Sequence, residues 1–324
     1  MSYRPPFQVS ADAIRRIAEI AALVERYSAR KEQSSALRLR RANRVKTIQA
    51  TLAIEGNTLS EEQVSAILSG RHVVGPLQEI QAVKNAIAVY ATADELDPYS
   101  VDDLLKAHGM MMSALIDEPG VFRRGGAGVV KDGEIIHMAP PAHLVPDLMN
   151  DLFAWLRTSN DHPLILGSVF HYELEFIHPF ADGNGRMGRL WQSLILGKWN
   201  PVFRQLPVET MVFGSQARYY QAINASSAAN DSGIFLDFML GEIVRTLRKH
   251  LSPSRPKTGN GDLCDRVYGY IRQSPGVRSG MIADKFAVGE RTAERCLQEL
   301  KRQGRIEFRG APRNGGYYPK DNDV

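Results

Sequence analysis

Apolar residues recur at helical spacing over most of the first 250 positions. The pattern predicts helices within residues 11–70, a part rich in Arg and Lys, and over Ile80–Ala93, Val101–Leu115, Leu144–Leu156, Gln216–Ala228 and Ile234–His250. Within the first stretch, Thr58 and Glu61 have the spacing of a capping box, which predicts that a new helix begins there.

The strongest apolar stripe belongs to a helix that begins near Pro163, since proline is favoured in a first helical turn. Its members are Leu166, Val169, Phe170, Leu174 and Ile177. Pro179 and Gly183 end this helix, and a further helix is predicted from Asn184.

The pattern changes between Gly120 and Pro141. Two short β-branched pairs, Val129-Val130 and Ile135-Ile136, flank Lys131-Asp132-Gly133. An Asp-Gly pair between such runs predicts a β-hairpin. The fold is therefore expected to be mainly α, with one hairpin in its central part.

A second, smaller domain is expected at the C-terminus. Residues 251–261 are rich in Ser, Pro and Gly and are typical of a linker. Residues 262–320 predict three helices and a two-stranded wing, the order of a winged helix: Leu263–Gln273, Met281–Phe286, Glu290–Gln303, Ile306–Phe308 and Tyr317-Tyr318. Acidic and basic residues alternate on the third helix. The charge pattern therefore does not decide whether this domain binds DNA, binds a protein or does neither.

Composition adds few constraints. The 324 residues are 44% hydrophobic and 23% charged, with a net charge of +4, a mild basic excess that suits polyanionic ligands. The cysteines, Cys264 and Cys296, form no CxxC motif, so they are expected to be small core residues rather than a disulfide or zinc site. The chain shows no signal peptide and no membrane span, so a cytoplasmic protein without a membrane partner is expected.

The densest polar cluster is His178–Arg189, with the sequence HPFADGNGRMGR. Gly183 and Gly185 allow successive backbone N–H groups to turn toward one point, and the helix that follows adds its positive N-terminal end. Arg186 and Arg189 lie three positions apart and can bind phosphate oxygens. This segment predicts a phosphate site.

Two further residues of the cluster bear on catalysis. Asp182 offers the hard oxygen ligand that Mg²⁺ needs when it bridges a polyphosphate. His178 lies at a helix end above the glycine turn, where a base near neutral pKa could take a proton from a hydroxyl. Together these residues predict phosphoryl or nucleotidyl transfer.

Other interpretations of the cluster are weaker. Its three glycines match G-x-G-x-x-G, but a dinucleotide-binding turn needs a preceding strand, and here the preceding segment has helical spacing. A purely structural turn with solvated arginines would explain a looser cluster. His171, two turns before His178, is interpreted as a core histidine.

The segment His178–Arg189 matches the signature H-P-F-x-[D/E]-G-N-G-R-x-x-R at every position, and the chain thereby resembles the Fic (Fic/Doc) family. The resemblance covers residues 120–246, including Met138–Pro141 and Arg218–Tyr220. It implies a helical Fic/Fido core with a β-hairpin flap. It also implies an enzyme, a nucleotidyltransferase that moves AMP from ATP to Ser, Thr or Tyr of proteins.

The resemblance also implies roles for individual residues. His178 would be the general base, Asp182 would hold Mg²⁺, and the flap around Val129–His137 would align the target as an added strand. The ATP contacts would come from Gly183, Asn184, Gly185, Arg186, Arg189, Tyr219 and Tyr220, the last two beside the adenine. Doc-like kinases carry Lys at the position of Gly185, so Gly185 favours AMP transfer over phosphate transfer.

A second short motif lies near the N-terminus. Thr51 and Glu55 share one helix face, and Gly56 is a natural helix stop. Glu55 opposes the helix dipole, which any nearby cation could offset. The three residues also resemble the Fic inhibitory motif [S/T]-x-x-x-E-[G/N], in which the glutamate pairs with the second motif arginine, here Arg189, and displaces the γ-phosphate of ATP.

The predicted organisation is therefore an N-terminal helical region over residues 1–100 with an inhibitory helix at about 44–56, a catalytic core over 101–250, the linker and the winged helix. The predicted function is AMP transfer to a protein, or to the chain itself, held back by Glu55. Alternatives are a nucleic-acid-binding regulator that mainly modifies itself, and removal of AMP. The sequence leaves open whether the chain forms a homodimer.

Overall fold

The computed structural model describes residues 3–31, 36–131, 134–251, 260–311 and 315–320. The chain forms two compact units, Met1–Ser252 and Pro253–Val324. The predicted N-terminal region and catalytic core therefore share one unit. Within the described residues, no helix is both long and apolar enough to cross a membrane.

The first unit is mainly helical, as expected. Its helices, in chain order, are α1 (Ala11–Lys31), α2 (Ala36–Ile54), α3 (Glu61–Leu68), α4 (Leu77–Ala91), α5 (Val101–Met111), α6 (Val145–Thr158), α7 (Pro163–Ile177), α8 (Asn184–Trp199), α9 (Val208–Phe213), α10 (Gln216–Ala229) and α11 (Gly233–Leu251).

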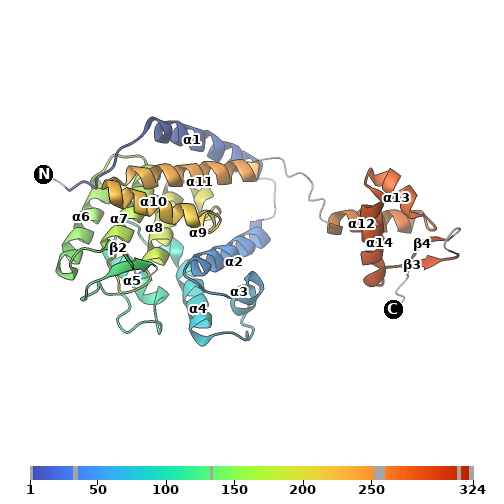
Figure 1. Ribbon diagram of the computed structural model, residues 1–324, viewed down its shortest axis with the longest axis horizontal. Coiled ribbons are helices and arrows are strands. Elements are labelled where there is room, and N and C mark those ends of the chain that lie inside the picture. The colour runs from blue at the N-terminus through green and yellow to red at the C-terminus, as the bar shows by residue number, and fades with distance from the viewer. Residues whose placement is uncertain (1–2, 32–35, 132–133, 252–259, 312–314, 321–324) are drawn as a thin grey trace. The chain divides into compact units, whose positions relative to one another are not determined.

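Helices α7 and α8 pack against each other at the centre of this unit. Helix α7 is buried on all sides, including Val169, Phe170 and Leu174 of its predicted stripe. A helix that is apolar all round is typical of a protein interior. Around this pair, α1 lies along α11, and α2 packs on α3, α4 and α9 (Figure 1). Helix α7, which ends just before the motif, and helix α8, which carries its second half, are thereby packed in the centre of the unit.

The hairpin is present as strands β1 (Gly128–Lys131) and β2 (Glu134–Met138), paired antiparallel. Its register shifts between Val129 and Val130, which marks an irregularity in the ladder. The Asp132-Gly133 pair of the predicted turn lies outside the described residues. Below the strands, the amide of Ala139 donates to the carbonyl of Ala127 at 3.1 Å and closes the base of the hairpin.

Some predicted boundaries are wrong. The capping box that begins α3 is formed by Ser60 and Gln63, because the carboxylate of Glu79 accepts hydrogen bonds from both the amide and the hydroxyl of Thr58. Helix α5 ends at Met111, four residues earlier than predicted, and Ala114 has a left-handed backbone (φ 57°). The short helix α9 was not predicted, since six residues give too little periodicity.

The second unit contains three helices and a two-stranded antiparallel sheet in the predicted order: α12 (Asn260–Gln273), α13 (Ser279–Phe286), α14 (Glu290–Arg302), β3 (Ile306–Arg309) and β4 (Gly316–Pro319). The apolar face of α14 is buried, as its spacing predicted. Cys264 and Cys296 are buried, as expected, but they are paired as a disulfide, which was not expected. Where α12 packs on α14, the Cα atoms of the two cysteines lie 5.2 Å apart.

Candidate active site

The catalytic candidate His178 caps the C-terminal end of α7. Its backbone is left-handed (φ 51°, ψ 60°), a conformation that non-glycine residues adopt only when the surroundings enforce it. Its amide donates to Leu174, and its ring Nδ1 lies 3.4 Å from the carbonyl oxygen of Glu175. A proton on Nδ1 directed at that carbonyl would leave the lone pair on Nε2, as a general base requires.

The loop after His178 is fixed by two buried side chains. Asn184 binds both polar groups of Phe180: its Oδ1 accepts from the amide and its Nδ2 donates to the carbonyl, each at 2.9 Å. His108, on α5, stacks on the ring of Phe180 and lies 3.0 Å from the carbonyl oxygen of Asp182 through Nε2. The Asn184 side chain is therefore engaged within the loop through its Oδ1 and one of the two N–H groups of Nδ2.

The N-terminal end of α8 has the features of an anion-binding site. Gly183 is the N-cap, in a left-handed conformation (φ 88°) that glycine adopts without strain, and it supplies no capping side chain. The first amides of an uncapped helix point toward any anion in front of them. The amide of Gly183 itself donates to Asp182 Oδ1 at 2.6 Å, so the helical amides that follow form the cradle.

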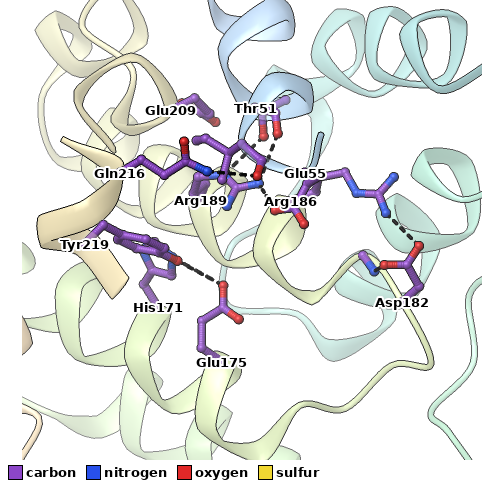
Figure 2. Close-up of polar contacts among 12 residues, drawn as sticks. Thr51, Glu55, His171, Glu175, Asp182, Arg186, Arg189, Glu209, Gln216 and Tyr219 are labelled. Carbon is purple, nitrogen blue, oxygen red and sulfur yellow. Dashed lines mark hydrogen bonds and ion pairs between the residues drawn. The ribbon is translucent and has the colours of Figure 1, made fainter. Parts of the chain in front are cut away.

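Arg186 lies beside this cradle with its side chain only 7% exposed. One of its terminal nitrogens donates to Asp182 Oδ2 at 2.9 Å (Figure 2). Its Nε is buried and has no hydrogen-bond partner among the described residues. A buried donor without a partner is costly, so this nitrogen is a natural contact for a phosphate oxygen.

Arg189 is buried against the end of α2. Its Nε donates to Thr51 Oγ1 (3.2 Å), and one terminal nitrogen donates to the carbonyl of Thr51 (3.1 Å) and to Glu55 Oε1 (2.6 Å; Figure 2). Burial acts to lower the pKa of Arg189, but the Glu55 carboxylate outweighs it and the pKa is raised. The structure thus brings the second motif arginine into contact with both polar residues of the N-terminal motif.

Glu55 occupies the capping position at the end of α2, one residue beyond its last helical residue. The amide of Gly56 donates to Ala53 and that of Asn57 to Leu52, and Gly56 has φ 89°, which together make a Schellman motif. Gln216 of α10 donates to the carbonyl of Ile54 at 3.1 Å. The helix end is therefore well fixed, and it directs Glu55 at Arg189.

A second carboxylate, Glu175, lies near the same point. It accepts a hydrogen bond from the hydroxyl of Tyr219 at 3.1 Å, and burial raises its pKa to about 7 (Figure 2). Burial also lowers the pKa of His171 to about 3, and His171 hydrogen-bonds Gln192, so it is the buried core histidine that its position suggested.

The tyrosine pair is divided between the interior and the surface. Tyr219 is buried within the Glu175 and His171 network, whereas Tyr220 is 43% exposed. Both rings lie on α10, and their centroids are 5.2 Å apart. Of the two, Tyr220 is the one with surface to offer a ligand.

A hollow of about 220 Å³ separates the end of α2 from the motif loop. Its lining includes Glu55, Asp182 and Arg186. Pockets that hold organic ligands usually measure about 300–1,000 Å³, so this one is small. Gly185 is also close to Glu55, since a Cβ atom there would come within 2.6 Å of Glu55 Oε1. The carboxylate therefore occupies space directly beside the phosphate cradle.

Asp182 has the chemistry of a magnesium ligand supplied together with a polyphosphate. Its side chain is 58% exposed at the mouth of the hollow. Among the described residues, no group of three or more His, Cys, Asp or Glu side chains could hold a metal by itself. Since Mg²⁺ is commonly bound by one or two carboxylates plus substrate phosphates, this single carboxylate fits such an ion.

Sequence reasoning missed several residues of the site. His108 and Glu175 lie on helices whose pattern predicts only core packing. Glu209, on α9, is fully buried and accepts hydrogen bonds from Tyr90 and Ser193 near Arg189. The sequence shows only that Glu209 is a charged residue at a position expected to be buried. That pattern does not identify the residues with which it forms hydrogen bonds.

Comparison with known proteins agrees with this geometry. The Fic/DOC family model matches residues 98–196. The crystal structure of a Fic family protein from Desulfovibrio desulfuricans G20 is 39% identical, with a TM-score of 0.75, over 99% of this chain and 100% of that one. The chain therefore belongs to the Fic/DOC family.

Curated relatives carry a more specific name. The protein adenylyltransferase fic-1 of Caenorhabditis elegans is 31% identical over 63% of this chain, and that of Caenorhabditis briggsae is 29% identical over 65%. The chain spans only about two fifths of the length of these relatives (39% and 42%).

Proposed function

We propose that this chain is a protein adenylyltransferase that transfers AMP from ATP to a Ser, Thr or Tyr hydroxyl of a protein. The observations that carry the proposal are the position of His178 at the end of α7, six residues before the uncapped N-terminus of α8, and the buried Arg186 in the first turn of α8, whose Nε lacks a partner among the described residues. A base, an anion cradle and a buried cation at one point are what an in-line attack on a phosphate needs.

In this mechanism, the Nε2 atom of His178 takes the proton of the target hydroxyl. The hydroxyl oxygen forms a bond to the α-phosphorus, and the bond from that phosphorus to the bridging oxygen breaks, so pyrophosphate leaves. The first amides of α8, at Asn184 and Gly185, stabilise the charge that develops on the α-phosphate. Arg186 and Arg189 bind the β- and γ-phosphates, and Tyr220, with Tyr219 behind it, borders the adenine.

Asp182 would hold a magnesium ion that binds together with ATP. The ion, held by this carboxylate and by the phosphates, would neutralise charge on the leaving pyrophosphate. Asp182 itself orients two neighbours, the Gly183 amide and the Arg186 guanidinium. The hairpin β1–β2 is a two-stranded sheet whose outer edges pair with no other strand of the described residues, and a target segment that adds there as a further strand would be aligned with the base.

The same proposal includes inhibition by Glu55. Its contact with Arg189 at 2.6 Å occupies a cation that the γ-phosphate would need. ATP then has to displace a carboxylate before it can bind with its α-phosphate in line with the target hydroxyl. Thr51 supports this state by accepting two hydrogen bonds from the same guanidinium.

The test uses the chain as its own acceptor, in the Glu55→Gly background. Incubation with ATP labelled at the α-phosphate is expected to label the protein, and incubation with ATP labelled at the γ-phosphate is not. His178→Ala should lower the labelling by about 10²–10⁴-fold, and the exposed His72→Ala should leave it unchanged. Labelling from γ-labelled ATP, or undiminished labelling in His178→Ala, would overturn the proposal.

A further inference from the structure

Arg123 differs sharply from its neighbour in the segment between α5 and β1. The Arg123 residue is only 6% exposed. The side chain of Arg124 is 81% exposed and forms an ion pair with Glu118 on the surface. A buried guanidinium has to satisfy its five N–H donors within the protein, so its partners indicate what it holds in place.

One set of partners is the turn that carries His178. The Nε of Arg123 donates to the carbonyl of His178 at 2.6 Å, and one terminal nitrogen lies 3.3 Å from the carbonyl oxygen of Ile177. The backbone amide of Arg123 donates to the carbonyl of Pro179 at 2.9 Å. Three consecutive carbonyl groups around the catalytic candidate are thus bound by a single residue.

The other set of partners is the base of the hairpin. One terminal nitrogen of Arg123 donates to the carbonyl of Gly125 at 2.8 Å, and the other donates to that of Pro140 at 2.6 Å. These two residues lie before β1 and after β2, on either side of the bond between Ala127 and Ala139. The same guanidinium therefore contacts both ends of the hairpin and the His178 turn.

The chemistry of these contacts suits positioning. The carbonyl groups at the end of α7 carry the partial negative charge of a helix C-terminus, which a cation stabilises. His178 has a left-handed backbone that its surroundings must enforce, and the short Nε contact acts on its own carbonyl. The planar guanidinium of arginine presents five N–H donors on three nitrogens, whereas the ammonium group of lysine offers three donors from one nitrogen.

We propose that Arg123 is a positioning residue that fixes the backbone of His178 and the base of the β1–β2 hairpin as one unit. Its catalytic consequence rests on the proposed function, because there the hairpin aligns the target hydroxyl and His178 removes its proton. If both are held by one guanidinium, the distance between target and base is set before the target binds. Arg123 itself touches neither ATP nor the target in this arrangement.

The test compares Arg123→Met, Arg123→Lys and the matched surface control Arg124→Met, all in Glu55→Gly. Amide hydrogen exchange is measured at the two places that Arg123 joins, residues 177–180 and the amide of Ala139. Arg123→Met should speed exchange at least ten-fold at both, and should lower self-modification by about 10²-fold. ATP affinity by calorimetry should change less than about three-fold, because the α8 cradle is not touched; Arg124→Met should match the parent.

Arg123→Lys keeps the charge but can bind fewer of the carbonyl groups. Its hydrogen-exchange rates in both regions should therefore lie between those of the parent and those of Arg123→Met. If Arg123→Met does not fold, the comparison of Arg123→Lys with the parent still tests the proposal. The proposal that Arg123 joins the His178 turn to the hairpin would be overturned if hydrogen exchange became faster in only one of the two regions or in neither. It would also be overturned if exchange became faster in both regions while AMP transfer stayed at the parent rate. If the Glu55→Gly parent transfers no label, the proposed function fails, and the exchange data still decide whether Arg123 joins the two elements.

Discussion

Replacement of Glu55 by glycine removes the carboxylate from Arg189 and leaves the rest of its surroundings in place. Thr51 still accepts from two nitrogens of the guanidinium, so Arg189 keeps partners in the variant. Residue 55 is the C-terminal capping position beyond the last residue of α2, so glycine there lies outside the helix interior, where it would be most destabilising. The change therefore acts on the charge contact rather than on the fold.

The size of the effect follows from the strength of that contact. A hydrogen bond between charged groups contributes about 1.5–3 kcal/mol net. The Arg189 side chain is 1% exposed and that of Glu55 31%, so water weakens the pair only in part. If productive ATP binding has to break this contact, its removal should raise AMP transfer by roughly 10- to 100-fold, since 1.4 kcal/mol is a factor of ten.

Initial rates of self-modification measure this in wild type, Glu55→Gly, Glu55→Gln and Arg189→Ala. Glu55→Gln keeps a hydrogen-bond acceptor without the charge, so its rate should fall between wild type and Glu55→Gly. Arg189→Ala should be slow with or without the Glu55 change, because it removes the group for which Glu55 and the phosphate compete. Equal rates in wild type and Glu55→Gly, with unchanged circular dichroism, would show that Glu55 only offsets the helix dipole.

Two further predictions concern charge. Asp182→Ala should weaken binding of Mg·ATP more than binding of metal-free ATP in paired calorimetric titrations, and equal losses would exclude Asp182 from a magnesium site. Burial raises the pKa of Glu173 to about 7, above its unfolded value, so this carboxyl destabilises the fold increasingly as pH rises from about 4.5 to 7. Glu173→Gln should therefore gain stability relative to wild type over that range, by up to about 1.4 kcal/mol per pH unit in urea unfolding, and parallel pH profiles would refute this.

The sequence predicts those features that depend on residues close together in the chain. The apolar stripe of α7, the proline at its first turn and the glycine at the start of α8 each act within a few positions, and the structure has all three. The local features around His178–Arg189, namely the end of α7 and the start of α8, could therefore be predicted from the spacing of residues in the sequence.

Contacts across the chain could not be predicted in this way. Thr58 has the side chain of a helix cap, yet it binds Glu79, 21 positions away, and Ser60 becomes the cap. Trp191 on α8 has the side chain of a core residue, yet its indole N–H donates to the carbonyl of Pro98, 93 positions away. In each case a polar group had more than one available partner, and tertiary packing decided between them.

The contact between Glu55 and Arg189 joins residues 134 positions apart, and its two sides are held very differently. Arg189 lies on the central helix α8, with its guanidinium against Thr51. Helix α2 is fixed by buried residues such as Ile48 and Leu52, and its end is fixed by Gly56 and Gln216. The partly exposed Glu55 side chain extends past this anchored end and lines the hollow. Release of inhibition would therefore require movement of one partly exposed side chain rather than loss of a helix, which is why a single substitution is expected to reproduce it.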